Sequence, residues 1–131
     1  MSDNEKKQIA TEKAPAAIGP YSQAIRSGDL LFCSGQLALD AQTGQMVEGG
    51  VAEQTRKSLE NLREVLAAAG VGFADVIKTT VYMTDLGRFS EMNEVYAEFF
   101  NSPPPPARAA VEVSALPKAA LFEIEAIARI Q

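Results

Sequence analysis

The stretch PPPPARAAVEVSALPKAALFEIEAIARI, from Pro103 to Ile130, decides the fold. It predicts two β-strands joined by a short loop, because side chains alternate between the two faces of a strand. In the second strand, Phe122 and every second residue after it are apolar, whereas Glu123 and Glu125 lie on the opposite face. If the two strands pair as a hairpin, Arg108 gathers with these carboxylates on the face away from the core.

Two interpretations of these charges are open. They are ordinary solvated groups on the wet face of a half-buried sheet, or they form a site. In a site, the planar guanidinium of Arg108 would bind a carboxylate through two hydrogen bonds. A nearby glutamate would orient or activate a water molecule. The strand pattern does not tell whether Glu123 or Glu125 reaches that water, and the glutamate that does not reach it would be a structural ion-pair partner.

The remaining pattern predicts one domain at residues 9–131, preceded by a flexible N-terminus at residues 1–8. Strands are expected near 22–26, at 30–37 and at 76–83, and amphipathic helices at 51–69 and 89–100. In the 30–37 strand, alternation places Phe32, Ser34 and Gln36 on one face. The order of elements predicts an α+β two-layer sandwich, in which a mixed β-sheet carries both helices on one face.

The sheet face without helices would then carry Phe32 and Tyr82 beside the charged groups. An exposed patch of this kind is unusual for a monomer. A closed homo-oligomer with its sheets packed around an axis would cover the patch. Asn93 lies beside the apolar stripe of the second helix, either as a local polar group or as an amide that faces a pocket.

Composition excludes several classes of function. The net charge of −5 argues against non-specific nucleic-acid binding, which depends on Lys and Arg. The chain has no histidine and one cysteine, Cys33, which excludes a Ser-His-Asp triad or a Cys-His pair and leaves almost nothing for a zinc site. Cys33 is predicted to be a buried thiol. Without an apolar signal core or an apolar run of membrane-spanning length, we expect a cytoplasmic protein with no membrane partner.

Six segments between Ile9 and Ala128 resemble the RidA/YjgF family of imine and enamine deaminases. They are IATEKAPAAIGPYSQAI, LFCSGQL, DVIKTTVYMTDL, NEVYAEFF, PPARAAVEV and LPKAALFEIEAIA. The resemblance implies a chorismate-mutase-like fold and a homotrimer with sites in the clefts between subunits. It also implies hydrolysis of reactive 2-imino acids, 2-iminopropanoate and 2-iminobutanoate, to 2-oxo acids and ammonia. This activity would protect pyridoxal-phosphate enzymes from 2-aminoacrylate, and it needs neither a cofactor nor a metal.

The resemblance assigns roles to individual residues. Arg108 matches the arginine that binds the substrate carboxylate, and Glu123 matches the glutamate assigned to the attacking water. Ala110 stands where close relatives often carry cysteine. If only the backbone carbonyl there receives the imine N–H, little is lost, whereas a role for the thiol would mean a different substrate range. Further positions that line the cleft are Tyr21, Ser34, Gly35 and Asn93. The alternatives are a non-catalytic trimer that binds small carboxylates and an RNA-directed translation inhibitor, against which the acidic charge and the absent histidine weigh.

Overall fold

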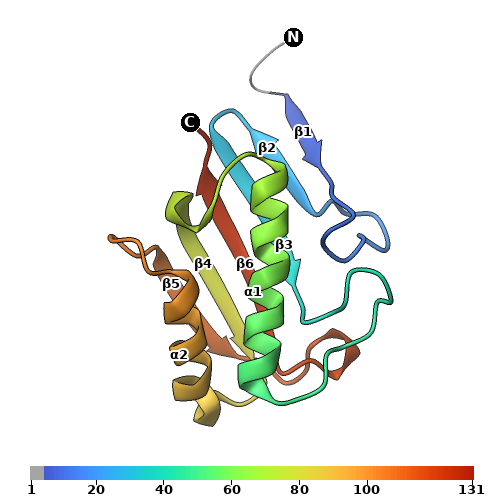
Figure 1. Cartoon of the computed structure of the whole chain (residues 1–131), viewed down its shortest axis with the longest axis vertical. Helices are drawn as coiled ribbons and strands as arrows, with labels where there is room; N and C mark the ends of the chain where they lie inside the picture. Colours follow the sequence, from blue (N-terminus) through green and yellow to red (C-terminus); the bar gives the residue numbers. More distant parts are fainter. Residues whose placement is uncertain (1–4) are drawn as a thin grey trace.

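The computed structural model describes residues 5–131, which form a sheet layer and a helix layer (Figure 1). The six-stranded sheet has the order β1-β2-β3-β6-β4-β5. Its strands are β1 (Lys6–Ile9), β2 (Ala24–Ser27), β3 (Leu30–Gln36), β4 (Val76–Met83), β5 (Ala107–Glu112) and β6 (Phe122–Arg129). The helices are α1 (Val51–Ala68) and α2 (Phe89–Phe99), with short 3-10 turns η1 (Phe73–Asp75), η2 (Leu86–Arg88) and η3 (Pro117–Ala119).

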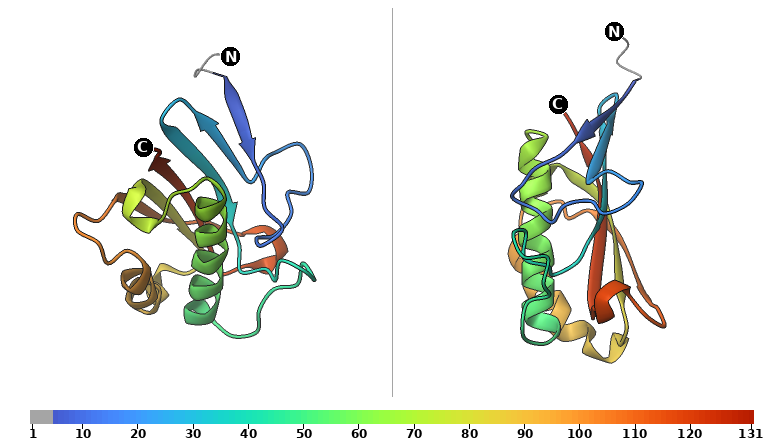
Figure 2. Two further views of the ribbon diagram at one scale, coloured as in Figure 1. Left: turned by 45° about the horizontal axis from the view of Figure 1, so that its top comes forward. Right: turned by 90° about the vertical axis from the view of Figure 1, so that its right-hand side faces the viewer.

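Both helices cover the same face of the sheet, as the side view in Figure 2 shows. The predicted α+β two-layer sandwich is therefore confirmed. Apolar residues recur along α1 at helical spacing, and Leu59, Leu62 and Leu66 are fully buried against the sheet. Across residues 5–131, no helix combines the length and the apolar character that crossing a membrane requires.

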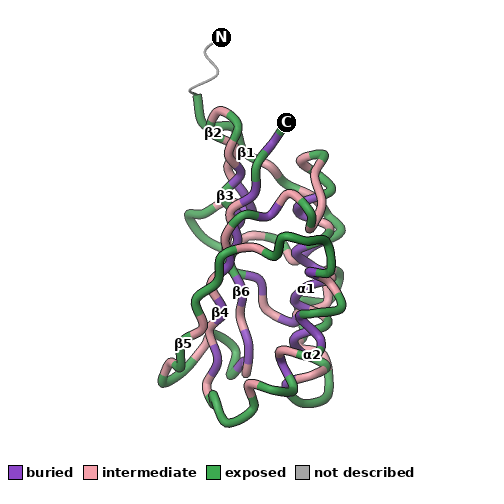
Figure 3. Tube along the Cα trace, turned by 90° about the vertical axis from the view of Figure 1, so that its left-hand side faces the viewer, coloured by how far each residue is buried: buried purple, intermediate pink, exposed green. Residues whose placement is uncertain are grey.

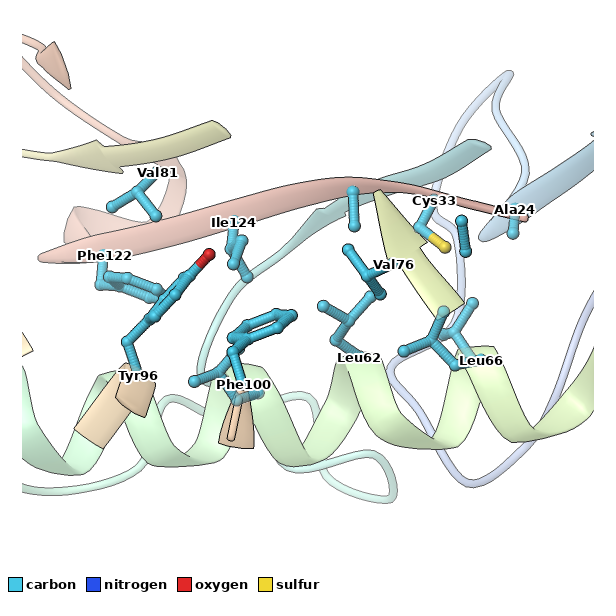
Figure 4. Close-up of a cluster of buried hydrophobic side chains, with 14 of the residues drawn as sticks. Ala24, Cys33, Leu62, Leu66, Val76, Val81, Tyr96, Phe100, Phe122 and Ile124 are labelled. Atoms are coloured by element: carbon cyan, nitrogen blue, oxygen red, sulfur yellow. The ribbon is translucent and has the colours of Figure 1, made fainter. Parts of the chain in front are cut away.

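Strand β6 lies at the centre of the sheet and supplies much of the core. It pairs antiparallel with β3 on one side and with β4 on the other. Its apolar face is buried as predicted: Phe122 and Ile124 pack between sheet and helices, close to Tyr96 of α2 and to Phe100, which directly follows that helix (Figure 4). Burying one side chain of this size contributes about 1.5–3 kcal/mol, so the apolar face of β6 stabilises the packing of the sheet against the helices.

The predicted hairpin between the last two strands is wrong. Strand β4 lies between β5 and β6, and β5 pairs with β4 in parallel, with Thr79 opposite Arg108. The reason is the intervening helix: β4, α2 and β5 form a strand-helix-strand crossover, which leads naturally to parallel neighbours. Strand β5 thus becomes an edge strand, and most of its residues are exposed (Figure 3).

The start of the chain also differs from the expectation of a flexible segment at residues 1–8. Strand β1 begins at Lys6 and pairs antiparallel with β2, with Lys6 opposite Ser27 and Ile9 opposite Ala24. Pairing with β2 supplies backbone hydrogen bonds that the local sequence pattern does not reveal. Residues 1–4 of the predicted flexible segment lie outside the described residues.

Cys33 on β3 is buried, as predicted from its apolar neighbours. Burial raises the pKa of the Cys33 thiol to about 12. A thiol with such a high pKa is almost entirely protonated near neutral pH, and the thiolate is the reactive form. We therefore interpret Cys33 as a residue that packs in the core and not as a nucleophile.

We expect Asn61→Ala to destabilise the fold. The Asn61 side chain is only 1% exposed, and its Nδ2 donates to the carbonyl oxygens of Leu37 and Leu39 at 3.0 and 2.9 Å. Leaving such buried carbonyls without donors costs about 1–3 kcal/mol. Urea unfolding at a fixed protein concentration measures the loss. Glu60→Ala on the same helix is the matched control, and equal midpoints for the two variants would contradict the assignment.

Candidate active site

Four of the predicted site residues lie around one hollow. Tyr21, Ser34, Gly35 and Glu123 all line a cavity of ≈ 690 Å³. They come from the loop before β2, the end of β3 and the start of β6. The remaining wall is largely apolar and includes Ile18, Leu37 and Leu39. We call this group of four residues the glutamate half-site.

A register shift in β3 shapes the glutamate half-site. The pairing of β3 with β6 is irregular between Cys33 and Gln36, so Gln36 turns into the core, whereas simple alternation predicted it beside Phe32. Gly35 lies in the irregular segment, and a Cβ atom there would overlap the Glu123 carboxylate. Only glycine allows this close approach of backbone and carboxylate.

Backbone contacts fix Ser34 at the same place. Its hydroxyl donates to the carbonyl oxygen of Ser22 at 2.6 Å, and its N–H donates to the carbonyl oxygen of Gln23 at 2.9 Å. The hydroxyl therefore also keeps lone pairs that can accept a hydrogen bond from a ligand.

Gln23 is a residue that the sequence analysis missed. Its buried side chain donates to the carbonyl oxygens of Thr11, Ala14 and Pro15 and accepts from the Thr11 N–H at 2.7 Å. These bonds tie the 10–23 loop to β2, and Gln23 itself lines the cavity. A single glutamine before a strand carries no pattern that would have revealed this role.

Glu123 has an environment that favours its protonated form. The side chain is half-buried, and this burial raises the pKa of the carboxyl above its ordinary value. The neighbouring charge of Glu125 raises the pKa further. A carboxyl group with a raised pKa is better matched to accepting a proton near neutral pH than an ordinary glutamate.

Glu125 does not form the predicted ion pair with any residue of the 5–131 segment. Its Oε1 instead accepts a hydrogen bond from the Tyr82 hydroxyl at 2.7 Å. This bond raises the pKa of the Tyr82 phenol. The residue directly opposite Glu125 in β4 is Thr80, which carries no positive charge. The hydrogen-bond partner of Glu125 is instead Tyr82, two residues further along β4 on the same face.

Arg108 lies on the other face of the sheet. It pairs with Thr79, whose side chain is buried on the helix side. Its Nη1 donates to Asn93 Oδ1 of α2 at 2.7 Å. Ala110 follows on the same face of β5, opposite Val81. We call Asn93, Arg108 and Ala110 the arginine half-site.

The predicted gathering of Arg108 with the carboxylates on one face is therefore wrong within a single chain. Glu123 lies opposite Tyr82 on the face without helices, whereas Arg108 lies on the helix side. The sequence-predicted residues fall into two half-sites separated by the sheet. Residues 5–131 contain no group of three or more His, Cys, Asp or Glu side chains placed to hold a metal ion.

The sheet face without helices also carries apolar side chains in contact with water. Phe32 on β3 is 43% exposed and Val111 on β5 is 41% exposed. Phe32 stands between Ile25 and Ile127 in neighbouring strands, so apolar groups form a row across the sheet. Exposed rows of this kind mark interaction surfaces more often than ordinary solvated sheet faces.

Comparison with known proteins gives relatives over nearly the whole chain. A RutC family protein of Pyrococcus horikoshii is 56% identical, with 94% of this chain and 97% of the relative covered. A Bos taurus protein named 2-iminobutanoate/2-iminopropanoate deaminase is 52% identical, with 98% and 93% covered. The crystal structure of E. coli TdcF with bound serine superposes with a TM-score of 0.89 at 45% identity, covering 95% of this chain and 99% of that chain.

The family model described as Endoribonuclease L-PSP matches residues 11–130. This range contains every element from β2 to β6 and both half-sites. The identities, the superposition and the matched range agree with the resemblance found in the sequence. The chain belongs to the Endoribonuclease L-PSP family, the RidA/YjgF family of the sequence analysis.

Proposed function

We propose that this protein is a hydrolase of C=N bonds that converts 2-iminopropanoate and 2-iminobutanoate to the 2-oxo acids and ammonia. The observation that carries the proposal is the 52% identity to the bovine deaminase over 98% of the chain. A human relative of the same name is 48% identical over the same share. The two half-sites contain a guanidinium, a group suited to binding a carboxylate, and a carboxyl group with a raised pKa, which supports the proposal.

The opposite-face placement of Arg108 and Glu123 favours a site built from two chains. A four-carbon imino acid is too small to reach both residues around the sheet of one chain. In a homotrimer, the arginine half-site of one subunit would face the glutamate half-site of the next, forming three sites at the seams. The exposed row around Phe32 on the open sheet face is a surface that such an assembly would cover.

Arg108 would bind the substrate carboxylate. A guanidinium offers two parallel N–H donors that match the two carboxylate oxygens. Because the imine carbon is bonded directly to the carboxylate carbon, fixing the carboxylate also fixes the carbon that reacts. The carbonyl of Ala110, two residues along β5 on the same face, would accept the imine N–H.

Glu123 would act on the water. Its carboxylate accepts a proton from water while the water oxygen forms a bond to the imine carbon, giving a tetrahedral carbinolamine. The protonated Glu123 then passes the proton to the amino nitrogen. Glu123 then takes the proton of the carbinolamine hydroxyl and passes it to the amino nitrogen, which leaves as ammonia as the C=O bond forms and the C–N bond breaks. Positioning of this kind lowers a barrier without any cofactor.

The biological role that we propose is removal of 2-aminoacrylate and its imine tautomer before they damage pyridoxal-phosphate enzymes. The cytoplasmic location and the absence of nucleic-acid and membrane partners stay predictions from composition. The alternative function, a trimer that binds small carboxylates without turnover, draws support from the serine bound in the E. coli relative. The family description also names a ribonuclease, and the net charge of −5 weighs against that activity here.

Arg108→Ala is expected to lower kcat/KM for 2-iminobutanoate by roughly a hundredfold, because charge-assisted hydrogen bonds to the carboxylate are lost. Arg108→Lys keeps the charge without the planar fork and is expected to recover only part of the loss. An amino-acid oxidase generates the imine, semicarbazide traps it, and the readout is the loss of semicarbazone on adding protein. Full activity of Arg108→Ala would remove Arg108 from the mechanism, whereas an inactive wild type that binds 2-oxobutanoate would favour the non-catalytic alternative.

The acid limb of the rate profile should report Glu123. A general base works deprotonated, so kcat/KM falls as pH falls through its pKa, and the raised pKa of Glu123 moves this limb above the pH of an ordinary glutamate. Glu123→Gln should be at least about a hundredfold slower and lack the limb. The same limb in Glu123→Gln would assign it to another group. Glu125→Gln provides a comparison. Removing the Glu125 charge should lower the pKa of Glu123, so the acid limb should move to lower pH.

Mixing two inactive variants tests whether a site spans two chains. Arg108→Ala and Glu123→Gln are unfolded together at equal amounts and refolded, so that subunits exchange. In random trimers, about one seam in four pairs an intact Arg108 with an intact Glu123, and activity should return to that fraction of wild type. Each variant refolded alone is the control. No recovery from mixed trimers would place both residues of each site on one chain.

A further inference from the structure

One face of α2 forms a receptacle for the Arg108 side chain. The guanidinium carbon lies 4.6 Å from the centroid of the Tyr96 ring and 5.3 Å from that of the Phe89 ring. Between these two rings in the sequence is Asn93, whose Oδ1 accepts from Nη1. The three residues are spaced four and three apart, so they share one face of the helix. Arg108 is thus held by two aromatic rings and one directed hydrogen bond.

The Tyr96 ring is itself fixed in place. Its hydroxyl lies 2.8 Å from Thr79 Oγ1, in a buried hydrogen bond, and its ring stacks on Phe100 with centroids 4.3 Å apart. Figure 4 shows Tyr96 reaching from α2 to the underside of the sheet. Thr79 is also the residue opposite Arg108 in the β4–β5 pairing. Thr79 therefore helps to set both the position of Arg108 and the orientation of the Tyr96 ring.

We propose that Phe89, Asn93 and Tyr96 are positioning residues that hold the Arg108 guanidinium in one orientation, with its remaining N–H groups directed at the substrate carboxylate. This inference rests on the proposed function, because it concerns how Arg108 meets its ligand. It also gives Asn93 a different role from the one that the sequence analysis expected. Asn93 acts through Arg108 and does not need to touch the substrate.

The receptacle answers a specific physical problem. Arg108 is on an exposed edge strand, where a long flexible side chain samples many rotamers and loses that freedom when it binds a ligand. A guanidinium placed against aromatic faces is attracted to them and keeps its hydrogen-bonding edge free. Holding the group in its bound orientation beforehand reduces the cost of binding, which is the general benefit of preorganisation.

Steady-state kinetics with paired substitutions test the proposal. Tyr96→Leu and Phe89→Leu each remove one ring, whereas Tyr96→Phe and Phe89→Tyr keep it. Phe99→Leu is the matched control, because Phe99 is an α2 aromatic that faces Arg63 instead. We expect each leucine variant at 89 and 96 to raise KM about tenfold, the size of an ordinary cation–π contribution. The kcat should stay within about twofold, and Phe89→Tyr and Phe99→Leu should keep the wild-type KM. Tyr96→Phe keeps the ring but loses its hydrogen bond to Thr79, so its KM should lie between those of the wild type and Tyr96→Leu.

A second readout does not depend on turnover. In protein with 15N-labelled arginine, Arg108 side-chain signals, assigned through Arg108→Lys, should be shifted by the ring currents of Tyr96 and Phe89. The shift should shrink in Tyr96→Leu and in Phe89→Leu and persist in Tyr96→Phe. Phe89 is only partly buried, so its variant remains informative if Tyr96→Leu does not fold.

The two readouts separate the possible failures. Unchanged Arg108 signals in both leucine variants, or a KM that rises equally in Phe99→Leu, would overturn the positioning role. An unshifted Arg108 signal in the wild type would do the same. If the wild type hydrolyses no imine, the proposed function has failed, and the Arg108 signals alone then decide whether the receptacle exists.

Discussion

The hydrogen-bonded placement of β6 between β3 and β4 is the constraint on which the rest of the structure depends. Because a strand sends alternate side chains to opposite faces, one strand provides both Phe122 and Ile124 to the core and Glu123 to the cavity. By occupying the inner side of β4, β6 also leaves only the outer side for β5. The parallel pairing there sets Arg108 beside Thr79, on the helix side. The position of β6 between β3 and β4 therefore determines where the core residues, the Glu123 carboxylate and the Arg108 guanidinium lie.

Periodicity within single elements was enough to predict much of this fold. The bounds of β4 and the alternation of β6 agree with the structure, and α1 ends within one residue of the expected position. What failed was pairing between elements. The hairpin expected after Arg108 treated β5 and β6 as neighbours because they are close in sequence, whereas α2 carries the chain across to the far edge of β4. Alternation also placed Gln36 beside Phe32, and the irregularity at Gly35 reverses its face. Neither a crossover nor a bulge leaves a periodic signal.

For the candidate site as well, the sequence identified individual residues but not how they are arranged in space. The resemblance to a known family selected Arg108 and Glu123, and the structure finds Tyr21, Ser34 and Gly35 around the same hollow as Glu123. The resemblance does not say which face of the sheet each residue lies on, because the face depends on how β5 and β6 each pair with β4. The contacts around these side chains were equally hidden, namely the hydrogen bond from the Tyr82 phenol to Glu125 and the aromatic rings around Arg108. Both arise between residues far apart in sequence, on elements that had to be placed first.

The opposite-face placement of Arg108 and Glu123 also bears on how much protein a cell must maintain. Under the proposed assembly, a newly made chain is fully folded and carries every required residue, yet it holds no complete site until it meets other copies. Deaminating capacity would then fall faster than the amount of protein once its concentration approaches the dissociation constant of the trimer. Expression level would act as a threshold, below which folded chains accumulate without clearing any imine.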